Sequence, residues 1–168
     1  RIQPFLTDAD VDRIQQAAAR VRRGRRLTRL RGELARYFLA DAYVFPLPDE
    51  GEEAIIRRLG GLLVQAGLIG EDYVENTIVR ERMSSTAFTD ALAVPHALQM
   101  TASRTAIAIG VADGSAAWGG GRVQVVALAA FSESDRAAFQ TVFEQLVAVF
   151  SERESVQRIV RKGTTFEA

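Results

Sequence analysis

The sequence predicts an α/β domain in which a mixed β-sheet is flanked by helices on both faces, with an N-terminal helical extension. Residues 105–111 and 123–131 are apolar runs of β-branched and small residues, which are typical of buried strands. Along the chain these runs alternate with stretches in which apolar residues recur at helical spacing. The 168 residues, 48% of them hydrophobic and 25% charged, suffice for one domain with a proper core.

The first 40 residues are expected to be a helical linker or extension, and residues 41–168 the domain itself. Apolar spacing predicts helices over residues 8–22 and 27–40, with Gly24 between them. Seven arginines lie from Arg20 to Arg31 without an interleaved aromatic residue, so we interpret them as a solvated helix face, with nucleic-acid binding as the alternative. The chain opens with Arg1 and not methionine, so we expect it to be part of a longer protein.

Within the domain, turn and cap residues divide the chain into alternating strands and helices. Asp113-Gly114 and the glycines at 119–121 are predicted turns, and the triple glycine lacks the lysine of a phosphate-binding P-loop. Gly67 should end one helix, and Ser151 with Glu154 forms a capping-box pattern for the last one. The expected elements are strand 42–47, helix 49–66, helix 72–82, strands 86–89, 91–95, 105–111 and 123–131, helix 135–150 and a last helix ending at Gly163.

Charge and composition exclude several classes of protein. Twenty-one basic and 21 acidic residues give a net charge of zero, so no global field attracts nucleic acid or an anionic membrane. The absence of cysteine excludes disulfides, thiolate catalysis and cysteine-based zinc sites, and agrees with a cytoplasmic protein. No apolar run approaches the roughly 18 residues that span a bilayer, and no signal-peptide pattern is visible.

The single histidine, His96, is the leading candidate for function. Pro95 cannot donate to a sheet ladder, so the apolar strand before it should end there and the His96 side chain should point out of the sheet edge. Ligand sites of α/β sheets gather at such carboxyl ends of strands. A neutral imidazole, with an ordinary pKa of about 6.5, is a nucleophile that can take a phosphoryl group and pass it on. The alternative is a structural histidine.

Two upstream residues could bind such a phosphoryl group. Arg80 offers a permanently charged planar fork that suits phosphate oxygens, and Thr86 offers a hydroxyl donor. Arg80 could instead be a cation at a helix C-terminus, and Thr86 an ordinary strand residue. No metal site is expected.

The segment from Arg80 to Ala97 resembles the active-site segment of the mannitol/fructose class of IIA domains (EIIA type 2) of the bacterial sugar phosphotransferase system (PTS), and the resemblance extends over about residues 41–163. It implies the mannitol-type IIA fold, a phosphoryl group on His96, reaction through Nε2, Arg80 and Thr86 at motif positions, and no cofactor. Arg82 falls outside the motif, and Thr89 departs from it where Gly or Ala is usual. The signature is met by Glu81, Phe88, Leu92, Ala93, Val94, Pro95, His96 and Ala97.

Transport versions of the mannitol type carry a second histidine, which here would fall near Phe139, but the chain has none. We therefore favour a regulatory sensor, phosphorylated on His96 by the phosphocarrier protein HPr, at the C-terminus of a transcription regulator resembling the BglG antiterminators. Its partners would be HPr and upstream regulatory domains of the same chain, with no direct nucleic-acid or membrane contact. Such a domain is a phosphoacceptor and not a turnover enzyme. The alternatives are a transport IIA that passes the group to an EIIB domain, and a protein-binding module with an inert His96.

Overall fold

A computed structural model describes residues 9–10, 12–14, 34–150 and 153–162 of the chain. Within them lies a four-stranded sheet in the order β1-β3-β4-β2, made of β1 (Phe38–Val44), β2 (Leu92–Ala93), β3 (Thr101–Trp118) and β4 (Gly121–Ser132). β3 and β4 form an antiparallel hairpin, and β1 and β2 add to its two edges in parallel. This confirms the predicted mixed sheet.

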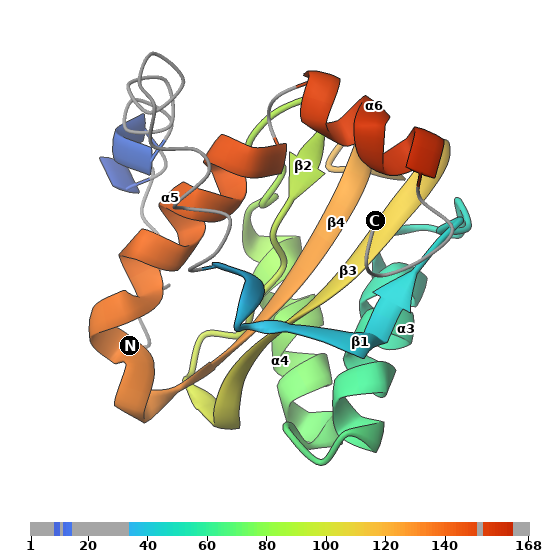
Figure 1. The fold of residues 1–168 in the computed structure, drawn as a ribbon. Coiled ribbons are helices and arrows are strands. Elements are labelled where there is room, and N and C mark those ends of the chain that lie inside the picture. Colours follow the sequence, from blue (N-terminus) through green and yellow to red (C-terminus); the bar gives the residue numbers. More distant parts are fainter. Residues whose placement is uncertain (1–8, 11, 15–33, 151–152, 163–168) are drawn as a thin grey trace.

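Helices cover both faces of the sheet (Figure 1), as predicted. α3 (Glu52–Gln65) and α4 (Glu71–Met83) lie on one face, and α5 (Phe139–Phe150) and α6 (Arg153–Lys162) on the other. The 3-10 helix η1 (Glu133–Ala138) leads into α5. Among the described residues, no helix combines the length and the hydrophobicity that a membrane-spanning segment needs.

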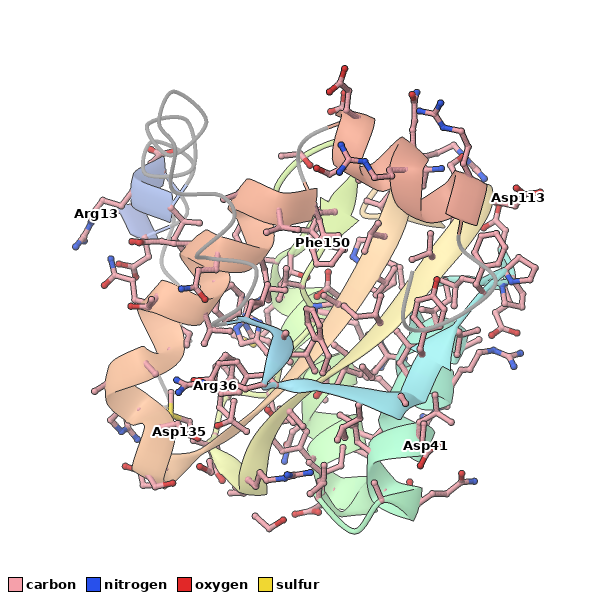
Figure 2. All side chains as sticks on the ribbon, in the orientation of Figure 1. Arg13, Arg36, Asp41, Asp113, Asp135 and Phe150 are labelled. Atoms are coloured by element: carbon pink, nitrogen blue, oxygen red, sulfur yellow. The ribbon has the colours of Figure 1, made fainter. Side chains whose placement is uncertain are left out.

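The alternation of side chains along β4 builds two separate cores. Val126 and Leu128 belong to the core beneath α3 and α4, whereas Val125 and Ala127 belong to the core beneath α5. Figure 2 places Phe150 at the end of α5, and its ring centroid lies 6.4 Å from that of Phe38 on β1. A strand with two buried faces requires a continuous apolar run, which explains the sequence of β4.

Glycines set two of the boundaries that the sequence predicted. Gly67, with a φ of 73°, follows α3, and the Leu68 N–H donates to the Leu63 carbonyl at 3.0 Å, which is the bond that closes a Schellman motif. The β3–β4 turn consists of Gly119 and Gly120, with φ values of 55° and 80°. Both turn positions need a left-handed backbone, which glycine adopts without strain.

Several predicted boundaries are wrong. β1 begins at Phe38 and ends at Val44, so the helix predicted over 27–40 cannot extend past residue 37, and the strand predicted over 42–47 is displaced. Asp113-Gly114 lies inside β3 and forms no turn, because pairing with β4 continues across it through an irregularity between Val111 and Ala116. Here long-range strand pairing overrides a local turn signal.

The strands predicted over residues 86–89 and 91–95 are much shorter than expected. They are reduced to the two-residue β2 and one isolated bridge between Ala87 and Ala93. The helix predicted from Asp135 is a 3-10 helix until Ala138. Residues 9–10 and 12–14 are helical, as predicted, but the rest of the helix over 8–22, most of that over 27–40, and the cap at Ser151 lie outside the described residues.

Candidate functional site

His96 continues the register of β2 along β4. His96 pairs with Ala129 as Leu92 pairs with Val125, and the Ala129 N–H donates to the Pro95 carbonyl at 3.0 Å. Because pairing resumes after the proline, side chains keep alternating and His96 faces α5. The prediction that His96 points out of the sheet edge is therefore wrong, since its side chain is 0% exposed.

Aromatic rings form the surroundings of the imidazole. The Phe143 ring of α5 meets the His96 ring edge to face, with centroids 5.1 Å apart. Phe88, Phe131 and Phe139 each pack in turn on Phe143. Phe143 is thus an aromatic neighbour of His96. It lies one turn beyond Phe139, near which a second histidine would fall.

The hydrogen bond and the burial of His96 define its chemical state. Nδ1 lies 3.0 Å from the Val94 carbonyl oxygen, which only accepts, so Nδ1 carries the proton and Nε2 holds the lone pair. Burial, opposed by the Val94 carbonyl and assisted by the charge of Arg80, lowers the pKa of His96 to about 3. The imidazole is therefore neutral at pH 7, with Nε2 as the nucleophilic nitrogen.

Arg80 lies in the last turn of α4 and is only 4% exposed. One terminal nitrogen, Nη1, donates to the Ser84 carbonyl at 2.8 Å, while Nε has no hydrogen-bond partner within the described part of the chain. Burial lowers the pKa of Arg80 and the neighbouring Glu81 raises it, and the Arg80 charge in turn acts on His96. A buried guanidinium N–H without an acceptor is unusual, and it could donate to an acceptor that enters the site.

Glu81 binds the third candidate, Thr86. The Thr86 hydroxyl donates to Glu81 Oε2 at 2.8 Å and its N–H donates to Oε1 at 2.7 Å, and the Trp118 indole N–H donates to Oε1 at 2.7 Å. Burial raises the pKa of Glu81 despite these donors. In this arrangement the Thr86 hydroxyl already donates its proton to Glu81. To donate to a phosphate, the hydroxyl would have to rotate away from Glu81.

The sequence did not indicate the role of Glu81, although Glu81 satisfies the acidic or amide position of the IIA signature. The carboxylate joins α4, the segment before His96 and the β3–β4 hairpin. Its partner Trp118 carries no sequence signal that connects it to this site.

Comparison with known proteins decides the family. The family described as "Phosphoenolpyruvate-dependent sugar phosphotransferase system, EIIA 2" matches residues 38–168. The chain belongs to this family. The match includes every candidate site residue, and it begins at the first residue of β1.

Relatives of this EIIA 2 domain include transcriptional regulators and phosphotransferase components. Transcriptional regulator ManR of Bacillus subtilis is 27% identical over 64% of this chain and 17% of its own length. The multiphosphoryl transfer protein of Escherichia coli O157:H7 is 31% identical over 69% of this chain and 31% of its own length. The mannitol-specific phosphotransferase enzyme IIA component of Halalkalibacterium halodurans is 28% identical, over 65% of this chain and 75% of its own. The chain thus spans under a third of the first two.

Solved structures share the fold of the EIIA 2 domain. The nitrogen regulatory protein IIA-Ntr of Neisseria meningitidis superposes with a TM-score of 0.68 at 17% identity, covering 80% of this chain and 94% of that one. Enzyme IIA-mannitol of Escherichia coli, solved in complex with phosphorylated enzyme IIB-mannitol, superposes with a TM-score of 0.54 at 18% identity. The match covers 74% of this chain and 99% of that one. These neighbours establish the mannitol-type IIA fold.

Proposed function

We propose that this EIIA 2 domain accepts a phosphoryl group from the phosphocarrier protein HPr on Nε2 of His96. The observation that carries the proposal is a neutral imidazole whose Nδ1 proton is held by the Val94 carbonyl, so that the Nε2 lone pair is the nucleophile. Attack forms the Nε2–P bond as the N–P bond of the carrier breaks. The proton stays on Nδ1, which donates it to the Val94 carbonyl, and this hydrogen bond stabilises the positive charge that the ring acquires.

Arg80 would bind the incoming phosphoryl oxygens. Its Nε lacks a partner among the described residues, and a charge-assisted bond to an oxygen would satisfy this buried donor. Thr86 would help only after its hydroxyl leaves Glu81. Because the His96 side chain is fully buried, transfer also requires a movement that exposes Nε2 to the carrier.

We further propose a regulatory role, in the cytoplasm, as the sensor module of a transcription regulator of the BglG type. Similarity to ManR supports it, as does the lack of a second histidine in the sequence. Ile14 and Leu34, which precede the sheet, are buried in the same core as Phe143, so a change at His96 has a packed route toward the N-terminal extension. Upstream regulatory domains would receive the signal.

A transport role is the second candidate, because the multiphosphoryl transfer protein is 31% identical. In that case an EIIB domain would receive the phosphoryl group, as the partner seen with enzyme IIA-mannitol suggests. A sensor should pass its group back to HPr readily but to a IIB domain poorly.

The test of phosphoryl acceptance uses phosphorylated HPr and mass spectrometry under alkaline conditions, which preserve phosphohistidine. We expect one acid-labile phosphate on the wild-type protein and none on a His96→Asn variant, which keeps a donor for the Val94 carbonyl. Phosphate absent from the wild type would favour the inert protein-binding module, whereas phosphate persisting on the variant would show that another residue is the acceptor.

The test of the regulatory role offers the phosphorylated domain to a purified mannitol- or fructose-type IIB domain, with an established transport IIA assayed alongside. We expect loss of label to IIB to be at least about tenfold slower than for the transport protein. Equal rates would assign the domain to transport.

A further inference from the structure

The pairing of the His96 segment with β4 ends at the bridge between His96 and Ala129. In this bridge the Ala129 N–H donates to the Pro95 carbonyl at 3.0 Å. A continuing parallel ladder would next use three groups on this edge: the Ala97 N–H, the Ala129 carbonyl and the Phe131 N–H. All three residues are buried, so these groups need partners.

The hydroxyl of one side chain, Tyr73, binds two of these groups. It donates to the Ala129 carbonyl at 3.1 Å and accepts from the Phe131 N–H at 3.3 Å. The N–H groups of Phe131 and Ala97 partly offset the burial that raises the pKa of Tyr73 to about 12. The hydroxyl thus stays protonated and replaces a rung of the sheet where the chain leaves β4.

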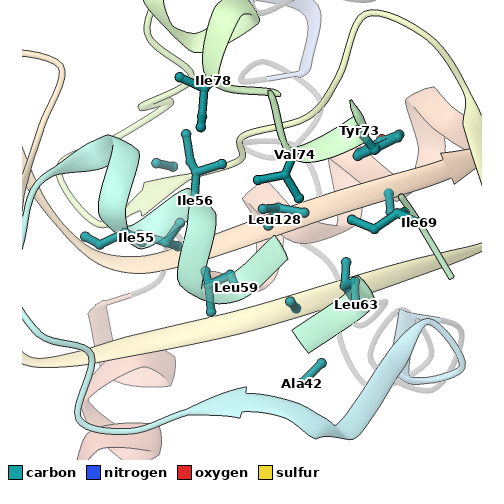
Figure 3. Close-up of a cluster of buried hydrophobic side chains, with 14 of the residues drawn as sticks. Ala42, Ile55, Ile56, Leu59, Leu63, Ile69, Tyr73, Val74, Ile78 and Leu128 are labelled. Atoms are coloured by element: carbon teal, nitrogen blue, oxygen red, sulfur yellow. The ribbon is translucent and has the colours of Figure 1, made fainter. Parts of the chain in front are cut away.

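The Tyr73 side chain is fixed by packing in the core beneath α3 and α4. It comes from the first turn of α4, its ring is buried in the core that includes Val74 and Leu128, and Figure 3 shows it beside β4. The ring approaches from the face of the sheet opposite to the one that the His96 side chain occupies. Tyr73 therefore acts on the β4 backbone beside His96 and lies across the sheet from the imidazole.

We propose that Tyr73 is a positioning residue for His96. The Pro95 carbonyl fixes the backbone before His96, and the Tyr73 hydroxyl fixes Ala129, the β4 residue that pairs with His96, so that the imidazole keeps its rotamer and its Nδ1 bond to Val94. The kinetic consequence rests on the proposed phosphoryl acceptance, whereas the positioning of the ring does not.

The test compares Tyr73→Phe with Thr105→Val. The Thr105 hydroxyl is also buried and accepts the Ser132 N–H of β4 at 3.1 Å, one residue beyond Phe131, so the control removes a similar bond on the side away from His96. Both variants should lose thermal stability. The single histidine gives one set of imidazole nitrogen signals in long-range 1H–15N NMR spectra, which report tautomer and environment.

For Tyr73→Phe we expect the imidazole signals to shift toward averaged tautomers. Phosphorylation by HPr should slow about tenfold at saturating donor with an unchanged KM, the effect of losing one hydrogen bond of about 1.4 kcal/mol. Thr105→Val should retain the wild-type spectrum and rate. An unchanged imidazole spectrum in Tyr73→Phe, or equal changes in both variants, would overturn the proposal.

Two outcomes separate this proposal from the proposed function. If the wild type accepts no phosphate, the phosphoryl-acceptor role fails, but the imidazole spectra still decide whether Tyr73 positions His96. If Tyr73→Phe does not fold, hydrogen exchange of the wild type decides: the Phe131 amide, which donates to the Tyr73 hydroxyl, should be protected as strongly as the Ala129 amide. Rapid exchange of Phe131 would show that the hydroxyl does not hold it.

Discussion

At the scale of the residue, burial decides the state of His96. An exposed imidazole would be partly protonated near neutral pH, and a protonated ring has no lone pair with which to attack phosphorus. Here burial and the charge of Arg80 keep the ring neutral, and the Val94 carbonyl assigns the proton to Nδ1. The same burial predicts a dependence of stability on pH.

His96 should make the fold less stable in mild acid. Its pKa is about 3 in the folded protein and 6.5 for the solvated imidazole of the unfolded chain, so its contribution is fully present above pH 6.5 and is lost as pH falls toward 3. Between pH 7 and 5 the wild type should lose about 1 to 2 kcal/mol of unfolding free energy relative to His96→Asn. Urea unfolding at both pH values measures this.

The comparison with His96→Asn also removes the effect of Glu81. Burial raises the pKa of Glu81 above 4.5, so Glu81 favours the folded state as pH falls, opposite in sign to His96, but it is present in both proteins. Equal pH dependence of the two proteins would mean that His96 is not held neutral by burial.

Arg80 and Arg82 give a matched pair of substitutions. Arg80 is buried and its Nε has no partner among the residues that the structure describes, whereas the Arg82 side chain is 67% exposed and pairs with Glu53. Arg80→Lys keeps the charge but loses the planar fork, so we expect phosphorylation of His96 to slow about tenfold while the protein stays folded. Arg82→Lys should leave the rate unchanged. Equal phosphorylation rates for the two variants would mean that Arg80 is only a cation at the helix C-terminus and does not bind the phosphoryl group.

At the scale of the element, α4 builds much of the site from one face. Four polar side chains on this face are buried at helical spacing: Tyr73, Thr77, Arg80 and Glu81. The Tyr73 hydroxyl binds β4 beside His96, the Thr77 hydroxyl binds the helix backbone, and Glu81 binds Thr86. Arg80 is the proposed phosphate ligand. The helix was predicted over nearly its full length. The burial of its polar face was not predicted, because a row of Tyr, Thr, Arg and Glu is typical of a half-solvated helix surface unless the distant partners of these side chains are known.

Two glycines near the end of α3 should respond in opposite directions to alanine. Gly67 has a φ of 73°, so Gly67→Ala should destabilise the fold by about 1 kcal/mol. Gly61 lies inside α3 with open space where a Cβ would go, so Gly61→Ala should stabilise by about 0.5 to 1 kcal/mol. Thermal unfolding measures both, and shifts of the same sign would contradict this account of the helix end.

The elements show where sequence reasoning holds. Strong local signals, such as the glycine after α3, the glycine turn and the apolar runs of β3 and β4, located their elements correctly. Local signals failed where distant pairing decides, at Asp113-Gly114 inside β3 and at Phe38 in β1. A strand edge or a bulge depends on the neighbouring strand, which no short window of sequence contains.

At the scale of the whole molecule, the position of β2 at the edge of the sheet explains how the site is assembled. In the order β1-β3-β4-β2, the His96 segment has β4 on one side only. Layers on both faces contribute to it: Phe143 from α5 contacts the ring, while Tyr73 from α4 binds the carbonyl of Ala129, the β4 residue that pairs with His96. His96 was identifiable from its motif, but its burial and the roles of Glu81, Trp118 and Tyr73 emerge only when these layers meet.

One measurement tests directly whether the fold prepares Nε2 of His96 to receive a phosphoryl group. Because the chain holds one histidine, long-range 1H–15N NMR of labelled protein follows that imidazole alone, before and after incubation with phosphorylated HPr. We expect phosphorus to couple to Nε2, while the proton stays on Nδ1 and remains hydrogen-bonded to the Val94 carbonyl. Phosphorus on Nδ1, or a phosphorylated protein whose imidazole signals do not change, would contradict this expectation.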